Sequence, residues 1–320
     1  MHSIITNSKV LITGGAGFIG SNLVKSLIGE NEIVVVDDLS MGKIENLPNA
    51  QGLSFYKHSI TDFEFMKDLL IKWNFDYIFL LAAVASVADT IERPAETHVV
   101  NQDADINVLE VIRSYGLKPK RLLFASSAAV YGNNLTLPKK ENSIVDPLSP
   151  YAIDKFATES FVIDYGNLYN IPTAVTRFFN VYGKNQNPDS PYSGVLSIVV
   201  EAAKGDGVFN VYGDGAQTRD FVYVDDVVSA LVVLAQNKKA IGNVYNVAYG
   251  KERSLNDVIA NISSIIGESL HPVYKDARVG DIKRSVADIS KIKSLGYAPQ
   301  FDLETGLKEY LHGELDHLND

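Results

Sequence analysis

A glycine-rich turn, placed between an apolar run and an amphipathic segment, is the feature that most restricts how this chain can fold. Residues 10–12 are apolar, and residues 14–20 read Gly-Gly-Ala-Gly-Phe-Ile-Gly. In such a turn Gly14 permits the tight bend, Gly17 lets the backbone approach a pyrophosphate, and Gly20 lets helix and strand pack closely. The pattern predicts a dinucleotide-binding strand–turn–helix unit, although a turn of this kind also occurs where no ligand binds.

Two acids follow the next apolar run. Residues 33–36 are Ile-Val-Val-Val, and Asp37 and Asp38 come directly after them. A carboxylate at the end of the second strand can accept hydrogen bonds from both hydroxyls of a ribose, and it repels a 2′-phosphate. These residues therefore favour NAD rather than NADP as the cofactor. A solvated loop at a strand end is the alternative that they leave open.

Strand-like and helix-like segments alternate through the first half of the chain, which is typical of a parallel sheet covered by helices on both faces. We predict an α/β fold, with a Rossmann-like doubly wound parallel sheet and a smaller mixed α/β substrate-binding domain. Residues 1–179, with 213–240 returning to them, would form the NAD-binding domain, and 180–212 with 241–320 would bind the substrate. Besides the strands expected at 10–12 and 33–36, strands are expected at 75–81, 121–125 and 221–224. Helices are expected at 21–28, 64–73, 101–114, 193–204, 227–236 and 254–266, and a loop at 185–194.

Composition narrows the class of protein. The net charge of −10 disfavours nucleic acid or an acidic membrane surface as a partner. The absence of cysteine excludes disulfides and thiolate metal sites, and we expect no metal. The first residues lack a signal-peptide pattern, and no apolar run is long enough to span a bilayer. A cytoplasmic protein is therefore expected.

A tyrosine and a lysine lie four residues apart near the middle of the chain. Tyr151 and Lys155 share one face of a predicted helix that Pro150 begins. An ammonium beside a phenol stabilises the phenolate and lowers its pKa, so that Tyr151 can act as a general base. Ser127 lies where a predicted strand ends, at the edge where doubly wound sheets bind ligands. An ordinary amphipathic helix and a polar strand end are the alternatives.

The order of these motifs resembles the extended short-chain dehydrogenase/reductases, and most closely the nucleotide-sugar 4-epimerases of the UDP-galactose and UDP-N-acetylglucosamine type. The resemblance runs from about residue 9 to 310. It includes Arg-Phe-Phe-Asn-Val-Tyr-Gly at 177–183, Gly-Asp-Gly-Ala-Gln-Thr-Arg-Asp-Phe at 213–221 and Arg-Val-Gly-Asp at 278–281. It implies an enzyme that keeps NAD tightly bound and recycles it.

The resemblance also implies roles for individual residues. Tyr151 would be the catalytic base, Lys155 its partner, and Ser127 the catalytic hydroxyl. The residues that match cofactor-binding positions are Gly14, Gly17, Phe18, Ile19, Asp37, Asp38, Ser40, Gly42, Ser59, Ile60, Leu81, Ala82, Ala83, Asn101, Ala125, Tyr151, Lys155 and Phe178. Those that match positions binding the UDP-sugar are Ser127, Asn180, Val195, Asn210, Tyr212, Arg219, Arg278, Asp281 and Ser285.

Two positions depart from the family pattern. Leu80 stands where the family has a histidine, and Ser59 stands where it has the first acid of an adenine-contacting turn, followed by Ile60 and Asp62. Both changes concern the packing of the cofactor. They put the adenine contacts in doubt more than the chemistry.

The residues after Ser127 bear on the reaction. Dehydratases of this type carry Asp-Glu, and decarboxylases a glutamate, where this chain has Ala128 and Ala129. Alanine can neither protonate a leaving group nor assist its departure. The expectation is therefore 4-epimerisation of a UDP-hexose through a 4-keto intermediate. The alternatives are a UDP-glucuronate 4-epimerase, a nucleotide-sugar reductase or dehydrogenase with net redox chemistry, and an NAD-sensing regulator.

The resemblance also bears on the substrate, through one further position, and on the assembly. Ser285 aligns with a gate that is a bulky tyrosine in strict hexose enzymes, so a 2-acetamido group would fit. UDP-GlcNAc and UDP-GalNAc are therefore favoured, with activity on UDP-Glc and UDP-Gal also expected, and a UDP-glucose-only enzyme is the alternative. Family members dimerise through a four-helix bundle, which here would use helices 101–114 and 155–169.

Overall fold

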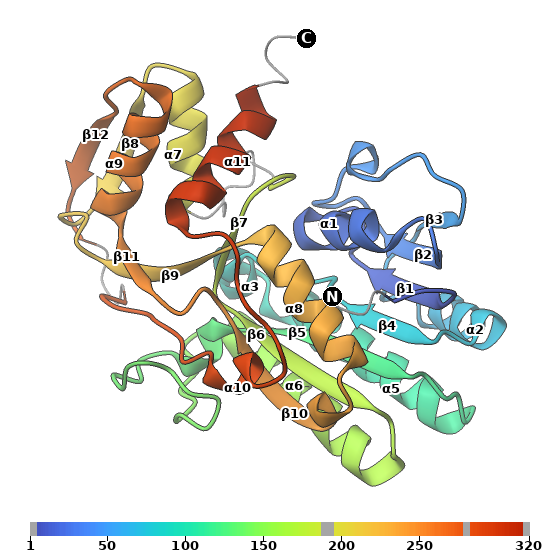
Figure 1. The fold of residues 1–320 in the computed structure, drawn as a ribbon. Coiled ribbons are helices and arrows are strands. Elements are labelled where there is room, and N and C mark those ends of the chain that lie inside the picture. Colours follow the sequence, from blue (N-terminus) through green and yellow to red (C-terminus); the bar gives the residue numbers. More distant parts are fainter. Residues whose placement is uncertain (1–4, 187–194, 278–281, 316–320) are drawn as a thin grey trace.

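The central sheet of the molecule has seven strands, all parallel. The computed structural model describes residues 5–186, 195–277 and 282–315. The strands lie in the order β10-β6-β5-β4-β1-β2-β3, so the order reverses between β1 and β4 (Figure 1). Their bounds are β1 Lys9–Thr13, β2 Glu32–Asp37, β3 Leu53–Lys57, β4 Tyr77–Leu80, β5 Arg121–Ser127, β6 Thr173–Phe178 and β10 Asn243–Val247.

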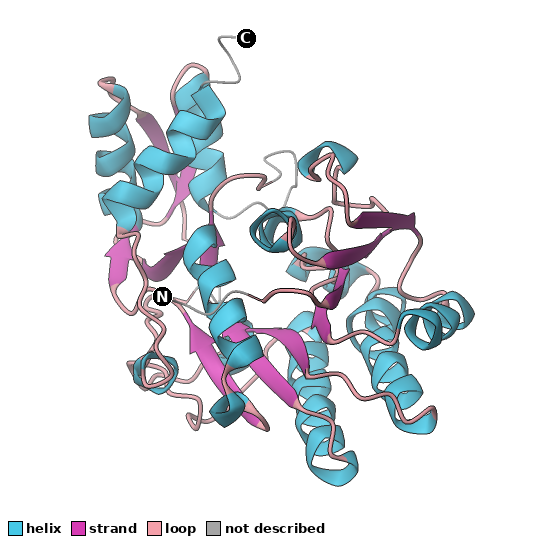
Figure 2. Cartoon of the chain, turned by 45° about the vertical axis from the view of Figure 1, so that its right-hand side comes forward, coloured by secondary structure: helices cyan, strands magenta, loops and turns pink. Residues whose placement is uncertain are grey.

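Helices cover both faces of this sheet, as Figure 2 shows. Alternate residues of β1 explain why: Val10 and Ile12 belong to one apolar cluster, and Leu11 belongs to another. The first cluster includes side chains of α1 and α8, and the second includes side chains of α2, α5 and α6. The doubly wound parallel sheet predicted from the sequence is confirmed. These helices are α1 Phe18–Leu27, α2 Phe63–Trp73, α5 Ala104–Ser114, α6 Pro150–Tyr169 and α8 Val224–Gln236.

A smaller lobe, at the upper left of Figure 1, has an apolar cluster of its own. A three-stranded sheet with the order β11-β9-β7 and a two-stranded sheet of β12 and β8 contribute to it. The bounds are β7 Asn180–Tyr182, β8 Val208–Tyr212, β9 Thr218–Tyr223, β11 Glu252–Ser254, β12 His271–Lys275, α7 Val195–Lys204, α9 Leu255–Ile266 and α11 Leu303–Leu315. The short elements are η1 Ile44–Asn46, α3 Val87–Glu92, α4 Pro94–His98, the π-helix η2 Val99–Asp103, η3 Ala128–Tyr131, η4 Lys238–Ala240 and α10 Ser290–Lys293.

Local sequence signals set the ends of α9. Ser254 and Asp257 form a reciprocal capping box at the start of this helix, and Gly267 ends it with φ of +74°. The helix predicted for 254–266 is therefore confirmed, because the signals at both of its ends depend only on neighbouring residues.

Elsewhere the expected elements needed correction. The strand predicted for 221–224 is β9, which ends at Tyr223, and Val224 instead begins α8 because Tyr223 has the extended backbone of an N-cap. The helix predicted for 101–114 begins as the π-helix η2. The predicted 185–194 loop falls largely outside the described residues, since 187–194 are not among them.

The predicted division into domains needs one structural qualification. Strand β10 was expected in the smaller domain, with the rest of 241–320, yet it pairs with β6 at the edge of the large sheet. Helix α8 packs on α1 and on strands of the large sheet. The predicted return of residues 213–240 to the NAD-binding domain requires such packing. The boundaries themselves remain a proposal.

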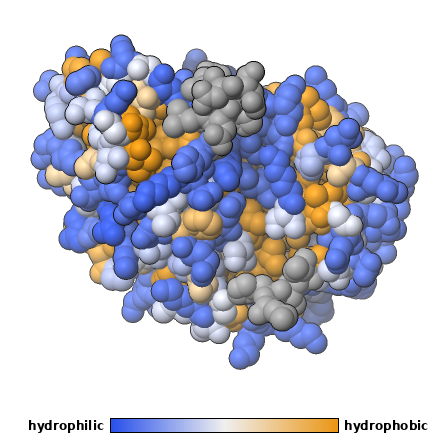
Figure 3. All heavy atoms as spheres, turned by 45° about the horizontal axis from the view of Figure 1, so that its top comes forward, coloured by the Kyte–Doolittle hydropathy of each residue, from blue (hydrophilic) through white to orange (hydrophobic). Residues whose placement is uncertain are grey.

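None of the described helices is long and apolar enough to cross a bilayer. On the face drawn in Figure 3, apolar groups form several separate patches among hydrophilic ones.

Candidate active site

The glycine turn lies between β1 and α1, beside the point where the strand order reverses. Gly14 has φ of +68°, and a Cβ there would lie 2.8 Å from the Ala82 backbone. A Cβ on Gly20 would lie 2.2 Å from the Gly14 carbonyl oxygen. Only glycine fits both positions, because backbone atoms cannot rotate away as side chains can. The tight turn and the close packing of helix and strand are therefore present as predicted.

The N-terminus of α1 is open toward a ligand. The helix begins at Phe18 with Gly17 as its N-cap, and no side chain caps it. A Cβ on Gly17 would meet only the Gly14 carbonyl oxygen, 3.2 Å away, so a side chain there would occupy the space in front of the helix. The first amides of a helix have no partners within it, and its dipole attracts anions. This turn therefore fits a pyrophosphate group.

Asp37, at the end of β2, is held by the glycine turn. Its Oδ2 accepts a hydrogen bond from Ala16 N–H and its Oδ1 accepts one from Leu39 N–H, both at 2.9 Å. Burial raises the pKa of this carboxyl, and the backbone hydrogen bonds partly offset that effect. Each oxygen keeps a lone pair for a further donor, such as a ribose hydroxyl. Asp38 is exposed and accepts from Ser40 N–H.

The segment after β4 is fixed by two polar side chains. Thr13 Oγ1 accepts hydrogen bonds from the N–H groups of Leu81 and Ala82, at 3.1 and 3.3 Å. The buried Asn101 accepts from Val84 N–H at 2.8 Å and donates to Val84 O at 3.1 Å. The amide of Asn101 is thus used to hold this segment, and its own contact with a cofactor stays a prediction.

The two departures from the family pattern have local explanations. Leu80 is a buried end residue of β4. Ser59 forms a hydroxyl–hydroxyl contact of 2.8 Å with Thr61, in the turn before α2. Ile60 is buried in the cluster that includes α2, and Asp62 caps that helix by accepting from Phe65 N–H.

Ser127 and Tyr151 meet where β5 ends and α6 begins. Ser149 caps α6 by accepting from Ala152 N–H at 3.2 Å, which places Tyr151 in the first turn. Burial raises the pKa of the Tyr151 phenol, and a hydrogen bond with Ser127 partly offsets the rise. The sequence predicted a lowered pKa for this phenol. In the chain alone the opposite holds, because the desolvation effect is the larger of the two.

Lys155 lies one turn further along α6 and is only 2% exposed. Its ammonium lies 4.7 Å from the centre of the Phe124 ring. Burial lowers the pKa of Lys155, whereas the charges of Asp105 and Asp154 raise it. Ser127 and Tyr151 are therefore adjacent, and Lys155 follows on the same helix one turn beyond Tyr151. The catalytic roles expected of the three residues stay predictions.

The residues expected to hold the UDP-sugar lie mostly on the smaller lobe. Arg219 on β9 donates hydrogen bonds to the carbonyl oxygens of Thr218 and Ile282, at 2.9 and 2.6 Å. Ser285 N–H donates to Thr218 O at 3.2 Å, so it lies beside this strand. Asn180 is in β7, Asn210 and Tyr212 are in β8, and Val195 begins α7; Arg278 and Asp281 lie outside the described residues.

Asp105 was not singled out from the sequence. It stands three, four and seven residues before Val108, Leu109 and Ile112, all of which are buried. An acid in the apolar stripe of a helix was the signal that could have revealed it.

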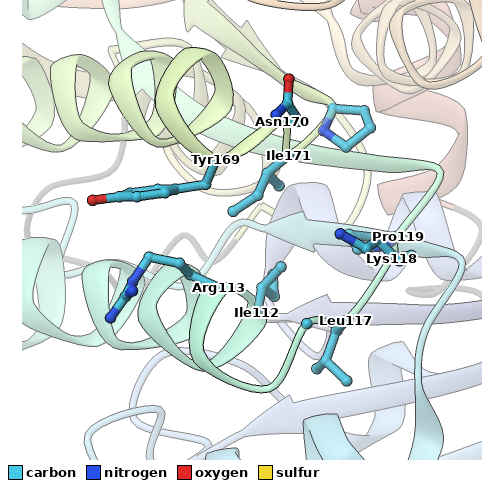
Figure 4. A pocket seen from close by; sticks show the side chains of 10 residues that line it. Ile112, Arg113, Leu117, Lys118, Pro119, Tyr169, Asn170 and Ile171 are labelled. Carbon is cyan, nitrogen blue, oxygen red and sulfur yellow. The ribbon is translucent and has the colours of Figure 1, made fainter.

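One cavity lies away from all of these residues. It has a volume of about 320 Å³ and is lined by the C-terminal ends of α5 and α6, with Arg113 and Tyr169 on its wall (Figure 4). Pro119 and Pro172, which also line it, precede β5 and β6. This cavity is therefore at the amino ends of the strands, opposite Ser127.

Known proteins resemble this chain over nearly its whole length. A family model described as GDP-mannose 4,6 dehydratase matches residues 11–310. The UDP-glucose 4-epimerase of Mycolicibacterium smegmatis is 36% identical over 304 residues, which cover 93% of this chain and 96% of that protein.

Two solved structures also superpose closely. A UDP-N-acetylglucosamine 4-epimerase of Methanobrevibacter ruminantium, in complex with UDP-N-acetylmuramic acid, gives a TM-score of 0.92 at 35% identity, covering 98% of this chain and 100% of that one. A UDP-glucose 4-epimerase of Thermus thermophilus, in complex with NAD, gives a TM-score of 0.85 at 31% identity, covering 95% and 98%.

Proposed function

The chain belongs to the extended short-chain dehydrogenase/reductase family of nucleotide-sugar enzymes, and from that premise we propose that it is an NAD-dependent 4-epimerase of UDP-hexoses. The observation that carries the proposal is the contact of Ser127 with Tyr151, with Lys155 one turn further along α6, at a strand end that continues with Ala128 and Ala129. A base and a hydroxyl are present there, and the two alanines offer no acid for elimination.

Tyr151 is the residue that takes the proton from the sugar 4-hydroxyl. The hydrogen bond between Ser127 and the phenol places the serine hydroxyl to orient or bridge that proton. The buried ammonium of Lys155, one helical turn away, stabilises the phenolate by its charge. When bound, NAD would supply the hydride chemistry at C4, and the positive charge of its oxidised ring would add to that of Lys155 in stabilising the phenolate.

The chain's own residues account for retention of the cofactor. The amides of Phe18 and Ile19 at the start of α1 would hold the pyrophosphate, Asp37 the adenosine ribose, and Lys155 the nicotinamide ribose. Arg219, with Arg278 and Asn180, would anchor the UDP diphosphate through paired, charge-assisted hydrogen bonds while the 4-keto sugar turns over. The cofactor is then regenerated in each cycle and no net redox change occurs.

UDP-GlcNAc and UDP-GalNAc are the proposed preferred pair, with UDP-Glc and UDP-Gal also accepted. The small side chain at Ser285, next to β9, is the feature that supports this choice. The test is a product assay with UDP-Glc, UDP-GlcNAc and UDP-GlcA side by side. Formation of UDP-GalNAc and UDP-Gal is expected, whereas exclusive conversion of UDP-GlcA would establish the uronate alternative.

Ser285→Tyr is expected to lower kcat/KM for UDP-GlcNAc by about tenfold or more relative to UDP-Glc, because a bulky gate excludes the acetamido group. The ratio of the two kcat/KM values is the measurement. Ser290→Tyr, at an exposed position five residues further on, is the matched control and should leave the ratio unchanged. An unchanged ratio in Ser285→Tyr would show that this residue is not the gate.

A homodimer is the proposed assembly, through a four-helix bundle of α5 and α6 from each subunit. Helix α6 carries exposed apolar side chains at Ile153, Phe161 and Leu168, which such a contact would cover. Light scattering after size exclusion should give twice the 35.1 kDa chain mass. A monomer mass at micromolar concentration would contradict the proposal.

A further inference from the structure

A buried carboxyl that the mechanism above does not use lies behind the catalytic lysine. Asp105, in the first turn of α5, is 1% exposed, and its Oδ2 has no hydrogen-bond partner among the described residues. Helix α5 packs on α6, which carries Lys155. Among the described residues, Lys155 carries the charge that acts on the Asp105 carboxyl. A buried ionisable group without a hydrogen-bond partner is costly, so its retention calls for a compensating charge.

Two carboxyls act on the Lys155 ammonium, and Asp105 has the larger effect. Asp154 Oδ1 lies 2.8 Å from His98 Nδ1, whereas its Oδ2, like that of Asp105, has no hydrogen-bond partner among the described residues. The Phe124 ring, from β5, attracts the ammonium only through its face. Tyr151, on the same helix, is neutral until it gives up its proton. His98 Nε2 in turn lies 3.6 Å from the half-buried Asp103 Oδ1.

The pKa shifts of Asp105 and Lys155 allow both side chains to be charged in the same pH range. Burial raises the pKa of the Asp105 carboxyl to about 7, and the charge of Lys155 lowers it in part. Above that pH Asp105 is negatively charged, and this is the range in which a buried lysine would otherwise lose its proton. No direct ion pair joins the two among the described residues, but both groups are buried, and two buried charges attract each other beyond hydrogen-bonding distance because water is excluded.

We propose that Asp105 is a positioning residue, a buried counter-charge that keeps the Lys155 ammonium protonated so that it can stabilise the Tyr151 phenolate. The inference deepens the proposed function, because it rests on the role given there to Lys155. Removing the Asp105 charge should lower the pH at which Lys155 deprotonates. The alkaline pH at which kcat declines should fall by a similar amount. KM for the UDP-sugar should change little, since Asp105 is not among the residues proposed to bind the UDP-sugar.

The test compares Asp105→Asn with Asp164→Asn, the same change at an exposed position further along α6. In holoprotein labelled with 13C at lysine Cε, the Lys155 signal is assigned by its loss in Lys155→Arg and followed against pH by NMR. We expect the Lys155 midpoint to fall by about one pH unit or more in Asp105→Asn and to stay unchanged in Asp164→Asn. The alkaline limb of kcat should shift in the same direction.

Equal Lys155 midpoints in the two variants would overturn the inference. Asp105→Ser, a second neutral and smaller replacement, gives the same comparison if the amide does not fit the buried position. The NMR titration needs no turnover, so a failed epimerase assay and a failed charge pairing remain separate results. A fall of kcat at all pH values with an unchanged midpoint would point to packing alone and would also contradict the proposal.

Discussion

Replacing Tyr151 with phenylalanine is expected to lower kcat by about 10²–10⁴-fold, the usual contribution of a general base. The phenol oxygen is the group that takes the substrate proton, and nothing else in the first turn of α6 can do so. The ring remains, so the helix and its Ser149 cap should be preserved. Steady-state assays with UDP-Glc and UDP-GlcNAc measure kcat, and acid release of the bound dinucleotide measures cofactor content.

The matched control is Tyr169→Phe, at the other end of the same helix. Tyr169 contacts the Tyr165 ring and the Arg113 guanidinium through its own ring, which the substitution keeps. This variant should retain normal kcat and normal NAD content. If Tyr151→Phe kept more than a tenth of the normal kcat, another group would have to be the base.

Gly20→Ala is expected to destabilise the folded chain by about 3 kcal/mol and to deplete the bound cofactor. The new Cβ would lie 2.2 Å from the Gly14 carbonyl oxygen and 2.7 Å from Gly15 Cα, so α1 must move away from the turn. Overpacking costs about 1–3 kcal/mol in general, and the upper end applies because backbone atoms form the obstacle. Urea unfolding gives the free energy, and the NAD content of the purified protein gives the second readout.

Gly205→Ala provides the comparison for this substitution. A Cβ there would have as its nearest atom the Ala202 carbonyl oxygen, at an ordinary contact distance of 3.7 Å. Its stability and NAD content should match those of the unmodified protein. Normal stability and full cofactor content in Gly20→Ala would mean that α1 does not depend on this close approach.

Sequence patterns predicted the elements whose signals are local. The strand before Gly14 and the capped helix from Ser254 to Gly267 depend on neighbouring residues, and both were found. Strand β10 was not predicted, because residues 243–247 join the sheet only through pairing with β6, almost 70 residues earlier. The start of α8 at Val224 likewise depends on β9, which ends at Tyr223 and pairs with β7 and β11, two strands distant from it in the sequence.

The candidate site likewise has features that the sequence predicted and features that it did not. The motif spacing predicted that Ser127, Tyr151 and Lys155 would come together, since one strand end and one helix face carry all three. The raised pKa of Tyr151 could not be predicted, because it follows from burial between elements that are distant in sequence. Asp105 escaped notice for the same reason: its partner Lys155 lies 50 residues away on a different helix.

In the proposed reaction, C4 of the sugar is oxidised and reduced again by a cofactor that stays bound. The most direct measurement uses UDP-glucose deuterated at C4, purified protein and no added NAD, with the products followed by NMR. We predict that the 4-epimer forms and keeps the deuterium at C4, with no accumulation of free NADH. Loss of deuterium from C4, or build-up of NADH in proportion to the sugar consumed, would contradict this account.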